Sequence, residues 1–216
     1  MKNLILIAVL FSVSIFADYS NHKDTKVVID ELVNEHGFEE SYVINVLKQA
    51  KKRKTALNSV ARPAEKTKTW DDYRAIFLKK KRISDGKKFI QNNITVLERA
   101  EKEFGVPKEV ITAILGVETD YGNIMGSYRV IDSLTTLGFD DPRRSKFFKS
   151  ELIQFFILTR ENNLDILKVK GSYAGAMGYG QFISSSYRAY AIDFDGDGYV
   201  DLFNSLEDAI GSTANY

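Results

Sequence analysis

The sequence contains no cysteine, and this absence excludes disulfide bonds, thiol catalysis and a lipid-modified cysteine near the N-terminus. An excess of charge of one sign is also missing, because 30 basic and 29 acidic residues leave a formal net charge of +1. Such a protein has no strong overall field to attract nucleic acid, and no nucleic-acid partner is expected. Sustained alternation of apolar and polar residues is absent too, which argues against extended β-sheets.

The first 17 residues have a pattern of their own. Lys2 precedes an apolar run from Leu4 to Phe16, which is short for a membrane span and typical of the core of a signal peptide. Ala17 fits the cleavage position. We therefore expect export, with membrane association as the alternative if the signal is not cleaved. The rest of this 216-residue chain is long enough for one sizeable core, or for one core with a small lobe.

Apolar residues recur at helical spacing along most of the remaining chain, so the expected fold is mainly α with little β structure. The predicted helices cover residues 27–50 with a break at 36–37, 70–77, a long segment through 89–104, 107–122, 130–137, and a segment that begins at 141–142. The last segment is expected to bury Phe147, Phe148, Phe155 and Phe156 on one side. A polar connecting segment precedes Trp70, whose ring is expected to dock back on the body.

Glu118 is the most informative residue of the chain. One helical face carries Ile111, Ile114, Leu115 and Glu118. A carboxylate that continues an apolar stripe is predicted to point into the protein, where desolvation raises its pKa. A carboxyl group that stays protonated near neutral pH can act as a general acid. The alternative is a structural glutamate that turns back to solvent or caps a neighbouring element.

The segment from Gly171 to Phe182 breaks the helical pattern with four glycines and interleaved tyrosines. Glycine permits close approach of the backbone to another surface. One interpretation is tight helix–helix packing. The other is the floor of a cleft, with Tyr173 and Tyr179 available for stacking on a flat ligand. Composition alone leaves both open.

A metal-binding pattern follows between Asp193 and Asp201. Carboxylates stand at loop positions 1, 3 and 5, glycine at 6 and a backbone carbonyl at 7, which is the order of an EF-hand loop and suits calcium. The alternative is an accidental turn rich in aspartate and glycine. Position 12 is Asn204 rather than glutamate, so the closing carboxylate is expected from Glu207 or Asp208.

These motifs together resemble the membrane-bound lytic murein transglycosylase B family, from about Val27 to the last residue. The resemblance rests on Glu35–Phe38, Arg62–Glu65, Trp70–Arg74, Gly116–Thr119, Pro142–Arg144, Lys170–Ser172, Gly175–Phe182, the aspartate loop and Asp208–Tyr216. It implies a lysozyme-like helical core with an EF-hand-like calcium loop. It also implies cleavage of the MurNAc–GlcNAc bond of peptidoglycan with formation of 1,6-anhydro-MurNAc.

The resemblance implies roles for individual residues. Glu118 corresponds to the catalytic residue. The expected substrate-binding residues are Ser172, Gln181, Tyr73 and Tyr216 in the cleft and Arg143 and Arg144 near the stem peptide, with Tyr173 and Tyr179 added from the glycine-rich segment. The expected calcium ligands are Asp193, Asp195, Asp197, the Tyr199 carbonyl and Asp208.

The expected organisation is a signal peptide over 1–17, an N-terminal helical segment with a connecting arm over 18–85, and a lysozyme-like catalytic core over 86–216. The family continues beyond the last motif and its founding members carry a lipidated cysteine, so a truncated, soluble periplasmic form is expected. Expected partners are glycan strands, stem peptides and cell-wall synthesis proteins, and the chain is expected to be a monomer.

Only one persuasive carboxylate is present, whereas ordinary glycosidases use two. A substrate that attacks itself removes the need for the second, so Glu118 would act first as acid and then as base. Two alternatives stay open at this point. One is a truncated, calcium-stabilised peptidoglycan-binding protein without turnover, and the other is a hydrolytic muramidase.

Overall fold

The computed structural model describes residues 18–62 and 68–216. The expected signal peptide and most of the Arg62–Glu65 motif lie outside these ranges. Within them, no helix combines the length and the apolar character needed to cross a membrane.

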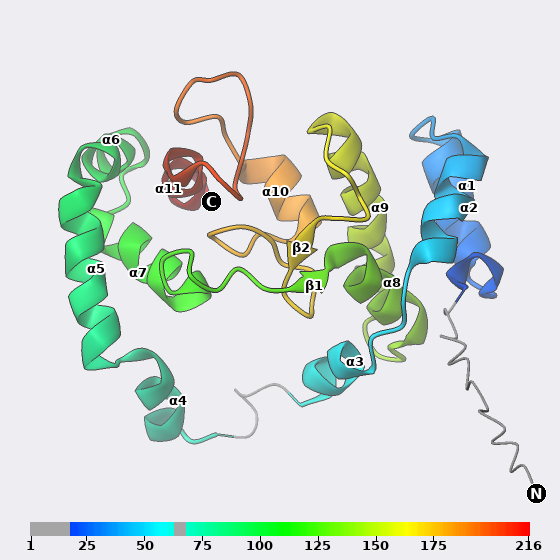
Figure 1. Cartoon of the computed structure of the whole chain (residues 1–216), viewed down its shortest axis with the longest axis horizontal. Coiled ribbons are helices and arrows are strands. Elements are labelled where there is room, and N and C mark those ends of the chain that lie inside the picture. Colours follow the sequence, from blue (N-terminus) through cyan, green and yellow to red (C-terminus); the bar gives the residue numbers. More distant parts are fainter. Residues whose placement is uncertain (1–17, 63–67) are drawn as a thin grey trace, which may run out of the picture.

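The described part of the chain is mainly helical, as predicted, and its strands form one antiparallel pair of two residues each (Figure 1). The elements are η1 Tyr19–Asn21, α1 Thr25–Asn34, α2 Glu40–Gln49, α3 Lys54–Ala61, α4 Trp70–Phe77, α5 Lys80–Asn92, α6 Ile94–Phe104, α7 Lys108–Thr119, β1 Tyr128–Arg129, α8 Val130–Asp140, α9 Ser145–Glu161, β2 Lys170–Gly171, α10 Ser184–Tyr190 and α11 Leu206–Asn215.

The predicted break between α1 and α2 is confirmed, and its cause is a glycine cap. Gly37 adopts a left-handed conformation with φ of 65°, which glycine accepts without steric cost. The Gly37 N–H donates to the Val33 carbonyl, which is the capping bond of the αL motif, and the Phe38 N–H donates to the Leu32 carbonyl. The chain therefore reverses, and α2 packs beside α1 against α9 (Figure 1).

The single long helix predicted through 89–104 is wrong, because the structure contains two helices that break at Asn93. The Asn93 backbone has a φ of −123°, and its side-chain amide donates to the Phe89 carbonyl at 2.8 Å. This local bond competes with continuation of the helix. The break allows Phe89 on α5 and Leu97 on α6 to join the same buried cluster.

Three further expectations are corrected. The Glu118 helix ends at Thr119 rather than at Gly122, because Asp120 already adopts the left-handed conformation with φ of 53°. Trp70 does not dock on the body and is 71% exposed. Phe147 is 37% exposed, with its ring under the Arg144 guanidinium at 4.6 Å, although Phe148 beside it is buried as expected.

Two hydrophobic clusters form the core. The first is built by α1, α2, α3, α8 and α9 and includes Phe182. The second is built by α5, α6, α7 and α11 and includes Phe194. The domain boundary expected at residues 85 and 86 falls inside α5 and stays a prediction.

Asp132 connects the N-terminal segment to the centre of the fold. Its carboxylate is fully buried on α8 and lies 2.6 Å from a guanidinium nitrogen of Arg53 and 2.6 Å from one of Arg129. It also accepts the backbone N–H of Lys51 at 2.9 Å. The described segment before α4 is thereby fixed to α8 by charge-assisted hydrogen bonds.

We predict that Asp132→Ala lowers the free energy of unfolding by about 3 to 5 kcal/mol, because removal of one partner leaves the two arginines without their buried counter-charge. Urea denaturation followed by circular dichroism measures this change. The control Asp30→Ala removes an exposed pair with Lys26 and should change the free energy by less than about 1 kcal/mol. Equal effects of the two substitutions would contradict the assignment.

Candidate functional site

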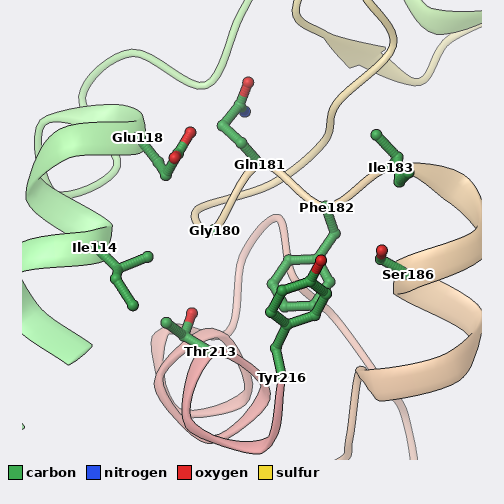
Figure 2. A pocket seen from close by; sticks show the side chains of 9 residues that line it. All are labelled: Ile114, Glu118, Gly180, Gln181, Phe182, Ile183, Ser186, Thr213 and Tyr216. Carbon is green, nitrogen blue, oxygen red and sulfur yellow. The ribbon is translucent and has the colours of Figure 1, made fainter. Parts of the chain in front are cut away.

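A pocket of about 320 Å³ opens where the two hydrophobic clusters meet (Figure 2). One wall comes from α7, the floor from the end of the glycine-rich segment, and the other walls from α10 and α11. Its lining residues are Ile114, Glu118, Gly180, Gln181, Phe182, Ile183, Ser186, Thr213 and Tyr216.

Glu118 faces this pocket and not the core. The buried face of α7 carries Ile111 and Leu115, whereas Ile114 is 39% exposed and Glu118 is also exposed. The predicted burial of all four residues on one face is therefore wrong. Ile114 and Glu118 are four residues apart and form a row of their own, which lies beside the buried row of Ile111 and Leu115. Figure 2 shows both side chains directed into the pocket.

The predicted effect on the Glu118 carboxyl nevertheless holds. Although the residue is exposed as a whole, desolvation by the surrounding protein raises the pKa of its carboxyl above the ordinary value. No cation is paired with this carboxyl among the described residues, so no attraction lowers the pKa again. Glu118 is also the single acidic residue that lines this pocket.

Thr119 fixes the end of α7 to the glycine-rich segment. Its side chain is 1% exposed, and its hydroxyl donates to the Tyr179 carbonyl at 2.8 Å. The same oxygen accepts the Gly122 N–H at 3.0 Å. The residue that follows Glu118 in sequence thus sets the distance between the carboxyl and the pocket floor.

The glycine-rich segment is not helical, so its close packing is not that of one helix on another, and its last residues form the floor of the pocket. Gly178 packs so closely on the next loop that an added Cβ would lie 2.4 Å from the Leu202 carbonyl oxygen. The chain then turns through Gln181, a non-glycine residue with φ of 53°, and Met177 pairs with Phe182. Close packing therefore produces the turn that presents Gln181 and Phe182 to the pocket.

Gln181 and Tyr216 are the predicted substrate-binding residues that the structure places beside Glu118. The Gln181 side-chain nitrogen donates to the carbonyls of Gly178 and Met125. Its amide oxygen accepts no hydrogen bond from the described residues. The Tyr216 ring lies edge-on against Phe182, with centroids 5.5 Å apart, and is 71% exposed.

Other predicted substrate residues do not line the pocket. The Ser172 hydroxyl accepts the N–H groups of Ala174 and Ala176 and thus shapes the turn before the pocket floor. Tyr73 packs on Phe77 in α4, with ring centroids 5.1 Å apart.

Two tyrosines and two arginines also lie outside it. Tyr179 is half-buried against Gly122, and Tyr173 is 38% exposed. Arg143 lies 3.8 Å from a carboxylate oxygen of Asp141, and Arg144 covers the ring of an adjacent phenylalanine.

Six lining residues were not predicted individually: Ile114 as a pocket residue, Gly180, Phe182, Ile183, Ser186 and Thr213. Phe182 and Thr213 lie within motifs that carried the family resemblance, so those motifs contained a usable signal. Ile183 and Ser186 had no distinguishing pattern, because their position depends on how α10 meets α11 in space.

The aspartate loop brings three predicted calcium ligands together. Ligand atoms of Asp193, Asp195 and Asp197 lie within 4.8 Å of one another. Asp193 accepts N–H groups of Gly196, Asp197 and Gly198, which bends the loop around the carboxylates. A concentrated set of hard oxygen donors of this kind fits calcium.

Asp208 lies apart from this group and holds the loop to α11. It is 1% exposed, and one carboxylate oxygen accepts the N–H groups of Phe194 and Asp195 while the other accepts that of Asp201. Its role as a ligand stays a prediction, as does that of the Tyr199 carbonyl.

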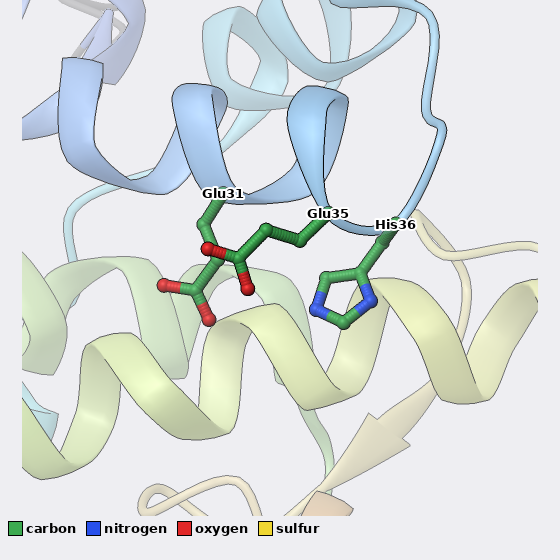
Figure 3. A group of neighbouring side chains, drawn as sticks. All are labelled: Glu31, Glu35 and His36. Atoms are coloured by element: carbon green, nitrogen blue, oxygen red, sulfur yellow. The ribbon is translucent and has the colours of Figure 1, made fainter.

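A second group of potential ligands lies at the end of α1, far from α7 in Figure 1. Glu31, Glu35 and His36 place ligand atoms within 4.8 Å of one another (Figure 3). These three side chains are half-buried or exposed, and none of them lines the pocket that contains Glu118.

Comparison with known proteins agrees with this architecture. A family model described as "Transglycosylase SLT domain" matches residues 20–216. The membrane-bound lytic murein transglycosylase B of Escherichia coli (strain K12) is 41% identical over 208 residues, which is 92% of this chain and 57% of that protein.

Solved structures are similarly close. The soluble lytic transglycosylase SltB1 of Pseudomonas aeruginosa is 47% identical with a TM-score of 0.83, over 88% of this chain and 64% of that one. The Escherichia coli lytic transglycosylase Slt35 in complex with calcium is 41% identical with a TM-score of 0.85, over 93% of this chain and 64% of that one.

The chain thus spans less than two thirds of the length of these relatives. The family model matched over residues 20–216 nevertheless includes the pocket, the aspartate loop and both hydrophobic clusters apart from Tyr19. The chain belongs to the transglycosylase SLT domain family.

Proposed function

We propose that the chain is a lytic transglycosylase that cleaves the MurNAc–GlcNAc β-1,4 bond of peptidoglycan and forms a 1,6-anhydro-MurNAc end. The observation that carries this proposal is a single carboxyl group, Glu118, that lines the pocket and has a raised pKa. A second acidic residue, which a hydrolase would use as nucleophile or base, does not line it.

In the proposed reaction Glu118 changes role within one turnover. Its protonated carboxyl donates a proton to the glycosidic oxygen as the bond from the MurNAc C1 atom to that oxygen breaks. The resulting carboxylate then takes the proton of the MurNAc C6 hydroxyl, whose oxygen bonds to C1. The N-acetyl group of the substrate can stabilise the cationic centre between these steps. Glu118 ends protonated, and no water is consumed.

The pocket walls support binding of an amino sugar in this orientation. The free Gln181 amide oxygen can accept from a sugar hydroxyl or an amide N–H, and the exposed Tyr216 ring offers an apolar face for the ring carbons. Ser172 acts through the turn that it shapes. SltB3 of Pseudomonas aeruginosa, 28% identical over 89% of this chain, is solved in complex with NAG-NAM-pentapeptide.

Residues outside the pocket fit more distant parts of a polymeric substrate. We assign Tyr73, Tyr173 and Tyr179 to the path of the glycan strand, and Arg143 and Arg144 to carboxylates of the stem peptide, which guanidinium groups bind in a bidentate manner. Such a substrate places the protein in the periplasm, in agreement with the signal peptide predicted over 1–17.

Calcium has a structural role in this proposal. The ion would be held by Asp193, Asp195 and Asp197 with the Tyr199 carbonyl, and it would neutralise the crowded carboxylates of the loop. Because Asp208 ties that loop to α11, loop order would be transmitted to the helix that carries Thr213 and Tyr216. Calcium supplies no chemical step.

We predict that Glu118→Gln lowers the rate of muropeptide release by at least about 100-fold, since it removes the proton donor. Digestion of purified sacculi followed by mass spectrometry measures the products. The control Glu109→Gln changes an exposed glutamate in the first turn of the same helix and should retain activity. Retained activity in Glu118→Gln would contradict the assignment of Glu118. Reducing ends in the digest by the parent chain would indicate a hydrolase. Binding of sacculi without any released product would indicate a protein that is not an enzyme.

The pH dependence of the reaction should report the same carboxyl. Because the protonated form is required, kcat/KM should fall as pH rises through the Glu118 pKa, and this limb should lie above the ordinary carboxyl value of 4.5. A raised pKa in the folded state also affects stability, because the folded protein then binds the proton more tightly than the unfolded chain does. The free energy of unfolding of the parent chain should therefore fall, relative to that of Glu118→Gln, as pH rises from the ordinary carboxyl pKa through the folded-state pKa of Glu118. A limb at or below the ordinary value would contradict the environment described.

Calcium should stabilise the fold. At a concentration of 100 times Kd, a ligand of the native state adds about 2.7 kcal/mol, which raises the Tm of a chain of this size by roughly 5 to 10 °C. Asp193→Asn should lose most of this shift in a calorimetric scan with and without a chelator. Asp165→Asn, in an exposed turn outside the loop, should keep it. An equal shift in both variants would place the ion elsewhere.

A further inference from the structure

Ser186 is a pocket residue that the proposed reaction leaves without a role. It lies on α10 and lines the pocket that contains Glu118. Among the polar side chains of this pocket, Glu118, Gln181 and Tyr216 have a place in the proposed reaction. The Ser186 hydroxyl forms no hydrogen bond with any described residue. It therefore has its full capacity to donate and to accept available for a ligand.

Three consecutive serines at the start of α10 have different surroundings. The Ser184 side chain is fully buried, and its hydroxyl is closed off from solvent. The Ser185 hydroxyl donates to the buried carboxylate of Glu151 at 2.6 Å, and the Ser185 N–H donates to the same group at 3.0 Å. Ser186 is half-buried, and its unpaired hydroxyl is open to solvent. The third serine thus presents a hydroxyl that a ligand in the pocket can reach.

The neighbours of this hydroxyl in the pocket are apolar. Figure 2 shows Ser186 beside Phe182 and Ile183, on the wall that faces Glu118 across the pocket. Ser186 is also the one residue of α10 in the pocket lining. This part of the pocket therefore combines a single hydroxyl with two hydrocarbon side chains. A ligand group that fits it has a polar atom next to a carbon surface.

An acetamido group has this composition, because its amide carbonyl and N–H adjoin a methyl group. A serine hydroxyl can donate to the carbonyl. The methyl group can then lie against Ile183 and the ring of Phe182, where it is removed from water. A sugar hydroxyl would pair with Ser186 but would leave these two apolar side chains without a contact. The surroundings of Ser186 thus favour an acetamido group over a sugar hydroxyl.

The position of Ser186 indicates which sugar carries this group. In the proposed reaction, the acetamido group of MurNAc stabilises its own C1 atom, next to Glu118. The Ser186 hydroxyl lies on the opposite wall of the pocket (Figure 2). Each sugar that adjoins a MurNAc in the repeating strand is a GlcNAc. The acetamido group at Ser186 therefore belongs to a neighbouring GlcNAc.

We propose that Ser186 is a specificity residue that binds the acetamido group of the GlcNAc next to the cleaved MurNAc. This inference rests on the proposed function. A glucosamine at the same position would present an ammonium group and no methyl group. The hydroxyl would then lose the carbonyl to which it donates, and the apolar side chains would lose their contact. The site would therefore discriminate between acetylated and deacetylated strands.

The test uses two ligands and one substitution in the Glu118→Gln chain, which prevents turnover. The ligands are a GlcNAc–MurNAc tetrasaccharide and the same tetrasaccharide with glucosamine in place of GlcNAc. In calorimetric titration, Ser186→Ala should raise the Kd of the acetylated ligand about 5- to 10-fold, and that of the deacetylated ligand less than about twofold. Comparison of the two ratios removes the effect of the ammonium charge, which is present with and without the hydroxyl.

Two other serines provide matched controls. Ser150→Ala changes an exposed residue of α9 outside the pocket and should leave both Kd values and the Tm unchanged. Ser185→Ala removes the hydrogen bond to Glu151 and should lower the Tm. Ser186→Ala should keep the Tm of the parent chain, because its hydroxyl forms no hydrogen bond with the described residues.

Three results would overturn the inference while the proposed function stands. The first is an unchanged Kd of the acetylated ligand in Ser186→Ala. The second is an equal rise in Kd for both ligands, which would show that the hydroxyl contacts a group other than the acetamido group. The third is a fall in Tm like that of Ser185→Ala, which would assign the hydroxyl a structural role. If the folded Glu118→Gln chain binds neither ligand, the proposed function fails together with the role of Ser186.

Discussion

The hydroxyl of Thr119 is the point on which the geometry of the site depends. It closes the end of α7, accepts an N–H from the turn that follows and donates to the backbone of the glycine-rich segment. One buried oxygen thus fixes the helix that carries the carboxyl relative to the floor on which a ligand would rest. Because these partners are main-chain groups, the arrangement does not depend on the rotamers of long side chains.

The opposite wall is fixed through a different route. Asp208 gathers three backbone N–H groups of the aspartate loop at the start of α11, and α11 then carries Thr213 and Tyr216 to the pocket. The aspartate loop is therefore connected to the pocket through Asp208 and α11. In this arrangement an ion in the loop would act on the site by ordering a helix, and it would need no contact with a ligand.

Much of the fold could be predicted from residues whose effects are local. Gly37 and Gly105 end helices through left-handed conformations, and both positions were predicted correctly. The break at Asn93 was missed, because the apolar spacing continues across it and a side-chain hydrogen bond interrupts the helix.

Part of the site could also be predicted. Glu118, Gln181 and Tyr216 were predicted to lie together, whereas the positions of Ser186 and Ile183 depend on how α10 packs against its neighbours. The orientation of Glu118 was also missed, since helical spacing does not distinguish the core from a pocket rim.

The position of the pocket between two hydrophobic clusters has a consequence for cooperativity. Phe182 belongs to one cluster, while α7 and α11 belong to the other, so the walls around Glu118 are not parts of a single packed unit. A group bound in this pocket would contact both clusters at once, so its binding would couple the two cores.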